Sequence, residues 1–306
     1  MPASPIAMST NFPSEVVSGI FSKVRGHSAL ARLSGQTPIA FTGNDVFVFS
    51  LDDEVNLVAE GGQKTEGSAA AVPVRIVPLK VEYGARVTDE FMYAAEEKQL
   101  DILGAFMDGY ARKIARGLDI MAFHGVNPRS KAKSTAIGTN CFDFNSGVTA
   151  IMYSSGSELA NLKAAVAAVG DADITGYALS RSFAEALSTV AVGHTAPFSA
   201  FMLGANPGTL NGTPADVNST VSFTGVAADG SDSTVYVTDH AIVGDFANAF
   251  KWGYSKQIPI EVIPYGDPDG NGDLKRTNQV FIRAEAWIGW GILDAGAFAR
   301  VSANPQ

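Results

Sequence analysis

The strongest pattern in the sequence is an apolar stripe over residues 98–123. Apolar side chains recur there at intervals of three and four, the period of one helix face; they are Leu100, Leu103, Met107, Tyr110, Ile114, Leu118 and Met121. The stripe predicts one long helix. Gly104, Gly109 and Gly117 interrupt it. Because each glycine costs about 1 kcal/mol relative to alanine, three of them indicate close packing or a need to bend.

A second feature is a long ribbon that precedes this helix. Residues 46–50 and 72–87 have the composition of strands, and residues 52–71 between them are rich in glycine, alanine and charge. This predicts a two-stranded hairpin with a polar tip. Pro73 and Pro78 cannot donate to a sheet ladder, so their strand is expected at an edge. Since a lone ribbon is marginal in water, it is expected to be mobile or to lie on another molecule.

The first 34 residues are expected to form an extended arm. Pro2, Pro5 and Pro13 disfavour a long regular element there, and a short helix is expected around residues 15–24. An arm with few apolar anchors needs a partner surface to become ordered. The sequence shows no signal-peptide pattern and no apolar run of about 20 residues, so we expect a soluble, intracellular product.

The remaining chain alternates helices and strands, which predicts a second domain. Ser155 and Glu158 have the spacing of a capping box that opens a helix ending near Val169. A strand is expected at residues 174–180 and a helix at 181–190, followed by a loop-rich stretch over residues 191–234. The later strands are expected near residues 235–238, 258–263, 279–286 and 297–301.

Composition limits the classes of function. The chain has 306 residues, 22 basic and 31 acidic side chains, a formal net charge of −9 and one cysteine. One cysteine excludes an intramolecular disulfide framework and a cysteine-rich zinc site. A protein whose main task is to grip nucleic-acid phosphates usually has a basic balance, so that class is disfavoured.

No motif predicts a convincing active site. Residues 267–273 match the first half of a calcium loop, but the twelfth position is Asn278 instead of glutamate, which favours a polar turn over a cation site. The four histidines lack metal-site spacing, and Cys141 has no base nearby in the sequence. Serine-hydrolase, phosphate-loop and dinucleotide fingerprints are absent. We expect no catalytic residue, cofactor or metal.

Eight segments, taken in order, carry a resemblance to a known family. They are residues 28–33, residues 58–61 with Lys64, and residues 87–91, 119–125, 210–214, 243–246, 283–285 and 297–299. Their succession resembles that of the tailed-bacteriophage major capsid proteins with the Hong Kong 97 capsid fold, from about residue 28 to residue 301.

This resemblance implies an α+β fold with named parts. Residues 1–34 would be the N-arm, and residues 35–149 the first part of a peripheral domain, with the hairpin called the E-loop at 46–86 and the spine helix at 98–123. Residues 150–257 would be the axial domain. Residues 258–293 would return to the peripheral domain and residues 294–306 to the axial domain.

The resemblance also implies a structural, non-enzymatic function. The chain would assemble as hexamers and pentamers into the icosahedral head of a tailed double-stranded DNA phage, after assembly in the host cytoplasm. It would enclose DNA without sequence-specific binding and use a separate scaffolding protein, a portal and, as an option, decoration proteins; no membrane is involved. Two alternatives remain open: an encapsulin-type shell around cargo enzymes, and a soluble α+β enzyme with a cation at residues 267–273.

Two further expectations concern the subunit interface. The E-loop charges are expected to dock on the spine helix of an adjacent subunit; the six residues are Glu60, Lys64, Glu66, Arg112, Lys113 and Arg116. The glycines Gly104, Gly109 and Gly117 are expected to act as hinges.

Some relatives form an isopeptide bond between an E-loop lysine and an asparagine. Lys64 is placed for it and Glu285 resembles the assisting carboxylate, but residues 271–278 offer no clear asparagine. We therefore expect non-covalent lacing.

Overall fold

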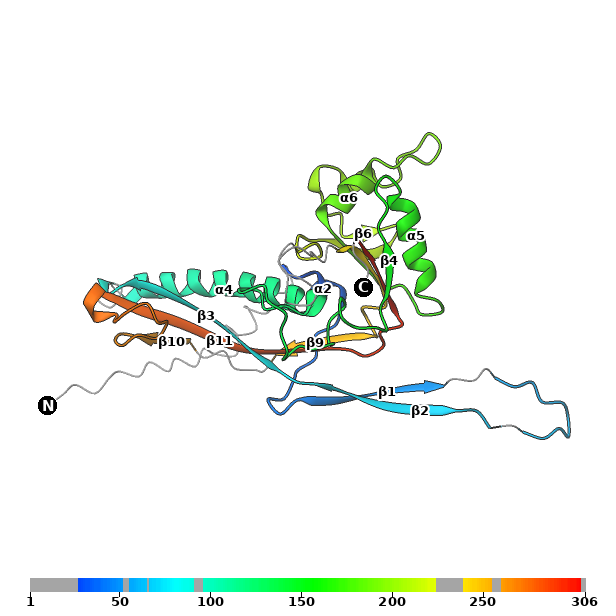
Figure 1. The fold of residues 1–306 in the computed structure, drawn as a ribbon, viewed down its shortest axis with the longest axis horizontal. Helices are drawn as coiled ribbons and strands as arrows, with labels where there is room; N and C mark the ends of the chain where they lie inside the picture. The colour runs from blue at the N-terminus through cyan, green and yellow to red at the C-terminus, as the bar shows by residue number, and fades with distance from the viewer. Residues whose placement is uncertain are drawn as a thin grey trace.

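The computed structural model describes residues 27–51, 55–64, 66–90, 96–223, 239–254 and 260–303. It shows a long body, a lobe above one end of the body and a ribbon that extends away from both (Figure 1). The helix expected around residues 15–24 and the strand expected at 235–238 lie outside the described residues. The mixed α+β class is confirmed.

The body consists of a long helix beside an antiparallel sheet. Helix α4 spans Glu96–His124, which confirms the predicted long helix. Five of the predicted stripe residues are buried in the core: Met107, Tyr110, Ile114, Leu118 and Met121. The central strand of the sheet is β11, Gln279–Ile292, which pairs with β3 (Leu79–Thr88), β10 (Ile260–Ile263) and β9 (Phe250–Tyr254). Strand β9 belongs to this sheet, although the resemblance places residues up to 257 in the axial domain.

The ribbon pairs β1 (Asn44–Leu51) with β2 (Ala69–Ile76). The prediction that residues 72–87 form one strand of this hairpin is wrong, because the chain changes partner at Val77 and Pro78 and continues as β3 in the body. Pro78 has no N–H to continue the ladder. Ile76 is buried beside Gly289 and Gly291 of β11, where a Cβ on either glycine would come within 3.1 Å of it.

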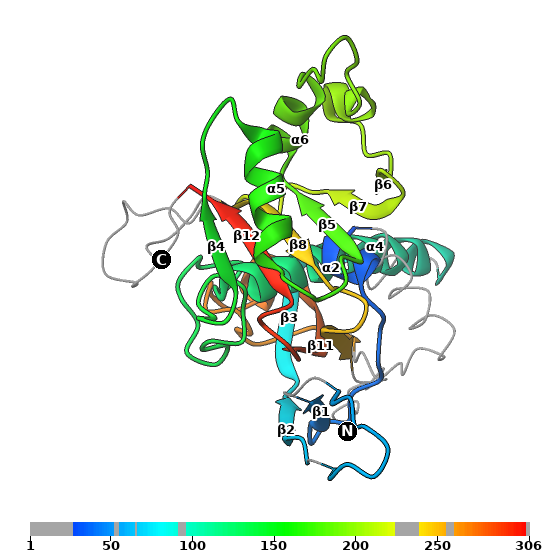
Figure 2. The ribbon, with the colours of Figure 1, turned by 90° about the vertical axis from the view of Figure 1, so that its right-hand side faces the viewer.

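The lobe contains a six-stranded sheet in the order β4-β12-β8-β5-β7-β6 (Figure 2). The bounds are Thr149–Met152 for β4, Gly176–Leu179 for β5, Thr209–Leu210 for β6, Thr213–Val217 for β7, Asp239–Gly244 for β8 and Phe298–Ser302 for β12. Helices α5 (Glu158–Ala168) and α6 (Arg181–Ser188) pack on one face of this sheet. Two short 3-10 helices, η1 (Ser199–Gly204) and η2 (Lys275–Thr277), complete the described elements.

The predicted capping box is wrong in its detail. Ser157 is the residue that precedes α5, and its side chain makes no capping hydrogen bond. The Glu158 carboxylate instead accepts hydrogen bonds from the Gly156 N–H at 3.0 Å and the Tyr153 hydroxyl at 3.1 Å. The acidic side chain therefore ties the helix to the end of β4 rather than to its own cap.

Helix α2 (Ala29–Leu33) joins the lobe to the body. Its buried side chains share one hydrophobic cluster with α4, with β11 and with the face of the lobe sheet opposite α5 and α6. The last residues of the segment that the sequence assigns to the arm are thus part of the core. None of the described helices is both long and apolar enough to cross a bilayer.

Candidate functional site

The ribbon exposes apolar side chains that its own chain leaves uncovered. Phe47 and Phe49 are 71% and 66% exposed and lie on the same face of β1, opposite Pro73 and Ala71 of β2. Beyond the paired strands, Leu57 is 98% exposed. A contiguous exposed apolar face of this kind marks an interaction surface.

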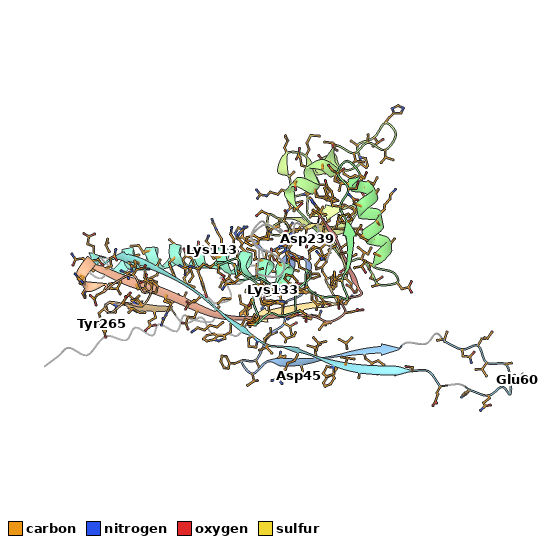
Figure 3. The ribbon with its side chains drawn as sticks, in the orientation of Figure 1. Asp45, Glu60, Lys113, Lys133, Asp239 and Tyr265 are labelled. Carbon is orange, nitrogen blue, oxygen red and sulfur yellow. The ribbon has the colours of Figure 1, made fainter. Side chains whose placement is uncertain are left out.

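The three charged residues that the sequence analysis named in the hairpin lie in the segment between β1 and β2, at the tip of the ribbon. Glu60, Lys64 and Glu66 are exposed, and none forms an ion pair within the described part of the chain. Glu60 is at the far end of the ribbon in Figure 3, well away from Lys113 on α4. One chain therefore does not bring the hairpin charges and the helix charges together.

The cations Arg112, Lys113 and Arg116 are exposed on the C-terminal half of α4. Within the described residues, Arg112 and Lys113 make no hydrogen bond or ion pair. Arg116 is engaged by its own chain, since its Nη1 donates to Ser219 Oγ at 3.1 Å and its guanidinium lies 5.9 Å from the centre of the Phe223 ring. Of these three helix cations, Arg112 and Lys113 are thus the two without such a contact in the described part of the chain.

The three helix glycines differ in their surroundings. A Cβ on Gly104 or Gly109 would meet nothing within 4 Å, so close packing does not explain them. Gly117 is buried, and its Cβ would lie 3.7 Å from Pro128. The two open glycines fit a need to bend better than the packed one.

A buried polar junction lies where α4 meets the lobe. His124 Nδ1 is 2.8 Å from Asp143 Oδ2, and its Nε2 is 2.8 Å from the Thr220 carbonyl oxygen. Arg300 on β12 donates to Asp239 on β8 at 3.0 Å and lies 3.5 Å from Asp143. Asp239 is labelled in Figure 3 at this meeting point. Sequence reasoning took His124 as an ordinary histidine and missed the others, because their positions are far apart in the chain.

The hydrogen bonds and the burial of this junction together favour a protonated His124. A carbonyl oxygen only accepts, so His124 donates from Nε2, and it also donates from Nδ1 to the Asp143 carboxylate. Burial alone would lower the pKa of His124, but the adjacent charge and hydrogen bond of Asp143 raise it to about 9. Burial and the charge of Asp143 raise the pKa of Asp239 well above its usual range. The pKa of Asp143 is lowered: burial opposes its ionisation, and the imidazolium of His124 outweighs burial.

The same acidic and imidazole groups could in principle surround a metal ion, since the ligand atoms of His124, Asp143 and Asp239 lie within 4.8 Å of one another. They do not fit one. Both ring nitrogens of His124 already donate, and the Arg300 guanidinium supplies a positive charge at the same place. The arrangement is a buried cluster in which the cationic side chains pair with the carboxyl groups.

Asp119, one helical turn before His124, makes a second buried junction. Its carboxylate accepts from the Ser28 hydroxyl, from the N–H groups of Ala29 and Leu30 at 2.9 and 3.2 Å, and from the Thr220 hydroxyl at 2.7 Å. Burial raises the pKa of Asp119 to about 6 despite these four donors. The contacts attach the first turn of α2 to the spine of the body.

The acidic turn at residues 267–273 holds a cation of its own chain. The Arg86 guanidinium, from β3, binds the Asp269 carboxylate through two nitrogens, lies 3.4 Å from Asp267 and donates to the Gly272 carbonyl oxygen at 2.8 Å. Its hydrogen bond to Asp269 holds the pKa of that carboxyl well below its usual range. The structure thus favours the polar turn over a calcium site. Cys141 is buried, which raises its thiol pKa to about 12 and disfavours a nucleophilic role.

Comparisons with known proteins agree on one family. The sequence matches the family described as "Phage capsid family" over residues 11–303. A search of the curated proteins found no match. Among solved structures, a chain of Mycobacterium phage Ogopogo is similar at 32% identity and a TM-score of 0.73, over 90% of this chain and 92% of that one. A chain of Gordonia phage Cozz has 26% identity and a TM-score of 0.66, over 90% and 86%.

A third similar structure is described as the capsid of an empty GTA particle, with 13% identity, a TM-score of 0.57 and coverage of 90% of both chains. At that identity the likeness concerns the fold alone. The exposed ribbon, the long helix and the two-sheet architecture are thus those of a Hong Kong 97-like capsid fold. The chain belongs to the phage capsid family, and it is a structural, non-enzymatic major capsid protein of a tailed-phage head, located in the capsid of the particle.

Proposed function

We propose that copies of this chain assemble as hexamers and pentamers that are laced together by the β1–β2 ribbon into a shell around double-stranded DNA. The observation that carries this proposal is the exposed apolar face of Phe47 and Phe49 on a ribbon that its own subunit does not cover. Apolar area returns about 25 cal/mol per Å² when it is buried, and obligate interfaces bury about 2,000–5,000 Å². A ribbon that is marginal alone is stable when it lies on a neighbour.

In this proposal the body is the peripheral domain, the lobe is the axial domain and residues before Ser28 form the N-arm. A separate scaffolding protein and a portal take part in assembly, and decoration proteins are optional. The order of elements supports the division into two domains, because β12 returns to the lobe sheet after β11 has completed the sheet of the body.

The hairpin residues Glu60, Lys64 and Glu66 dock on the spine-helix face of an adjacent subunit, where the two glutamates pair with the helix cations. Arg112 and Lys113 are the principal acceptors, because Arg116 is engaged by Ser219 and Phe223. The test is a charge swap. E60K/E66K and R112E/K113E should each reduce the yield of particles in negative-stain electron microscopy, and the combined variant should recover it. Equal loss in the combined variant would remove the pairing.

The lacing is non-covalent. Glu285, the carboxylate that resembles the assisting residue of cross-linking relatives, is occupied by Lys80 at 2.8 Å and Arg283 at 3.6 Å within its own chain. Particles boiled in denaturing detergent should run as a single monomer band, whereas a ladder of multimers would contradict this part of the proposal.

The open glycines serve as hinges of the spine helix during shell maturation. G104A and G109A should each stabilise the helix by up to about 1 kcal/mol and slow the change in particle diameter. G117A, at a packed position, is the matched control. The hinge assignment fails if G104A and G109A particles change diameter at the same rate as the parent.

A further inference from the structure

A cluster of cations lies where the C-terminal half of α4 meets the loop that follows it. The basic loop surface consists of Arg116 on α4 with Arg129, Lys131 and Lys133 on the loop, all exposed. Arg116 and Lys131 approach the same ring, at 5.9 and 5.8 Å from the centre of Phe223. The fold therefore gathers these charges into one surface.

No carboxylate balances these four cations in the described part of the chain. Elsewhere on the body and the ribbon, the cations Arg75, Lys80, Arg86 and Arg283 each pair with an acidic side chain. The sequence has no acidic residue between Asp119 and Asp143, although the chain as a whole carries a net charge of −9. Like charges held close together repel, and an anionic partner relieves that cost.

Aromatic rings hold three of the four cations in place. Phe223 faces Arg116 and Lys131, and Lys133 lies 3.9 Å from the centre of the Phe144 ring. A cation–π contact orders a long side chain without cancelling its charge, as a salt bridge would. These side chains are ordered and still carry a full charge toward solvent.

The backbone of the loop is also fixed. Lys131 has a φ of +61°, a left-handed conformation that is uncommon for lysine. Asn127 maintains it: its carbonyl oxygen accepts from Lys131 N at 2.7 Å, and its side-chain oxygen accepts from Arg129 N at 2.9 Å. Conformations of this kind persist where the surrounding structure imposes them, and they cluster at functional sites.

The chemistry of the surface favours a polyanion over a protein partner. The large apolar side chains that are exposed in the described residues include none between Ile102 and Met152, and the rings of Phe144 and Phe223 are only partly exposed beneath the cations, so a protein would find little apolar contact here. Protein interfaces normally contain an apolar centre. Phosphate groups need only positive charge.

We propose that the basic loop surface binds the phosphate backbone of the packaged duplex DNA, and so faces the interior of the shell. This inference rests on the proposed function, in which the shell encloses DNA. Contacts from lysine and arginine to phosphate carry no sequence information. The acidic balance of the rest of the chain confines the attraction to this surface, and the many copies in a shell add weak contacts together.

The test measures binding of a short fluorescent duplex DNA to the full-length, unassembled chain over a series of NaCl concentrations. The test variant is R129Q/K131Q. The control is K275Q/R276Q, which removes two exposed cations from the distant η2 turn. Each phosphate contact contributes about 0.9 to the slope of log affinity against log salt, so the test variant should lose about 1.8 of that slope and the control none.

Unchanged DNA affinity in R129Q/K131Q, or an equal loss in K275Q/R276Q, would overturn the proposal. Normal DNA binding with loss of particles would identify the surface as a contact between subunits and would also overturn it. Because the DNA measurement uses unassembled chains, its result does not depend on the shell. Circular dichroism melting of the variants shows whether they fold, and R129Q alone, which touches no aromatic ring in the described structure, gives a second reading with half the expected slope change.

Discussion

The ribbon and the junction at the end of α4 contrast in burial, because the ribbon exposes apolar side chains and the junction buries charged ones. In the ribbon, Phe47 and Phe49 are exposed on strands that pair only with each other among the described residues. In the junction, four ionisable groups are buried and pair with one another; they are His124, Asp143, Asp239 and Arg300. The junction makes its contacts within a single chain, whereas the ribbon leaves apolar side chains uncovered.

This difference separates two kinds of defect. Changes at the junction should act on the free energy of unfolding of the isolated chain. Changes on the ribbon should leave that free energy almost unaltered and act on assembly. The four predictions below test this separation, beginning with the largest expected loss of stability.

The largest effect is expected for Arg300→Met. Removing one member of a buried charged group leaves the carboxylates without compensation, which costs about 3–5 kcal/mol. Urea denaturation of the unassembled chain measures it. The matched control is Arg283→Met, whose partially exposed pairs with Glu261 and Glu285 are worth less than about 1 kcal/mol. Equal losses of unfolding free energy in the two variants would show that the buried junction contributes no more to stability than an exposed ion pair.

The second effect is a loss of stability as the pH rises. The pKa of His124 is about 9 in the folded chain against an ordinary value of 6.5. Because the folded pKa is raised, protonated His124 contributes its full stabilisation below pH 6.5, the ordinary pKa value. This contribution is lost as the pH rises from about 6.5 to about 9, and the free energy of unfolding falls by up to about 3 kcal/mol in total. The comparison is a His124→Gln variant measured at the same pH values. If the variant loses as much stability between pH 6.5 and pH 9 as the parent chain, His124 does not cause the pH dependence.

The third effect concerns the entry of the chain into the body. The Ser28 side chain caps α2 by accepting from Ala31 N and donates to Asp119. Ser28→Ala should therefore destabilise the chain by about 1–2 kcal/mol. Ser157→Ala is the control, since Ser157 precedes α5 without making a capping bond. Similar melting temperatures for both variants would contradict this role.

The smallest effect on stability is expected on the ribbon. Phe47→Ser with Phe49→Ser should change the unfolding free energy by no more than about 0.5 kcal/mol, because both side chains are already in water. The same variant should fail to form particles in electron microscopy. A large loss of stability in the isolated chain would mean that the ribbon packs on its own subunit.

Local sequence patterns predicted the long helix and the ribbon, because both are specified by residues that lie close together in the sequence. The apolar period placed α4 within two residues of its observed ends. The lobe sheet was predicted in part. The strands expected at residues 174–180 and 297–301 are confirmed as β5 and β12, whereas β4 and β7 were missed because both are short and β7 contains a proline and an aspartate. Their pairing partners, which decide that they are strands at all, lie far away in the sequence.

The charged groups show the same limit. Exposed charges such as Lys113 could be selected from the sequence as candidate interface residues, because their place on the polar face of the predicted helix does not depend on a distant partner. The junction could not, since Asp143 and Arg300 become adjacent only when β12 returns to the lobe. A resemblance to a family supplied the order of elements that local patterns lacked.

The guanidinium of Arg86 inside the acidic turn has a consequence for how the head behaves in solution. Here the neutralising charge is covalently part of the polypeptide, on a strand of the same sheet. This corner of the subunit should therefore keep its shape when EDTA removes divalent cations.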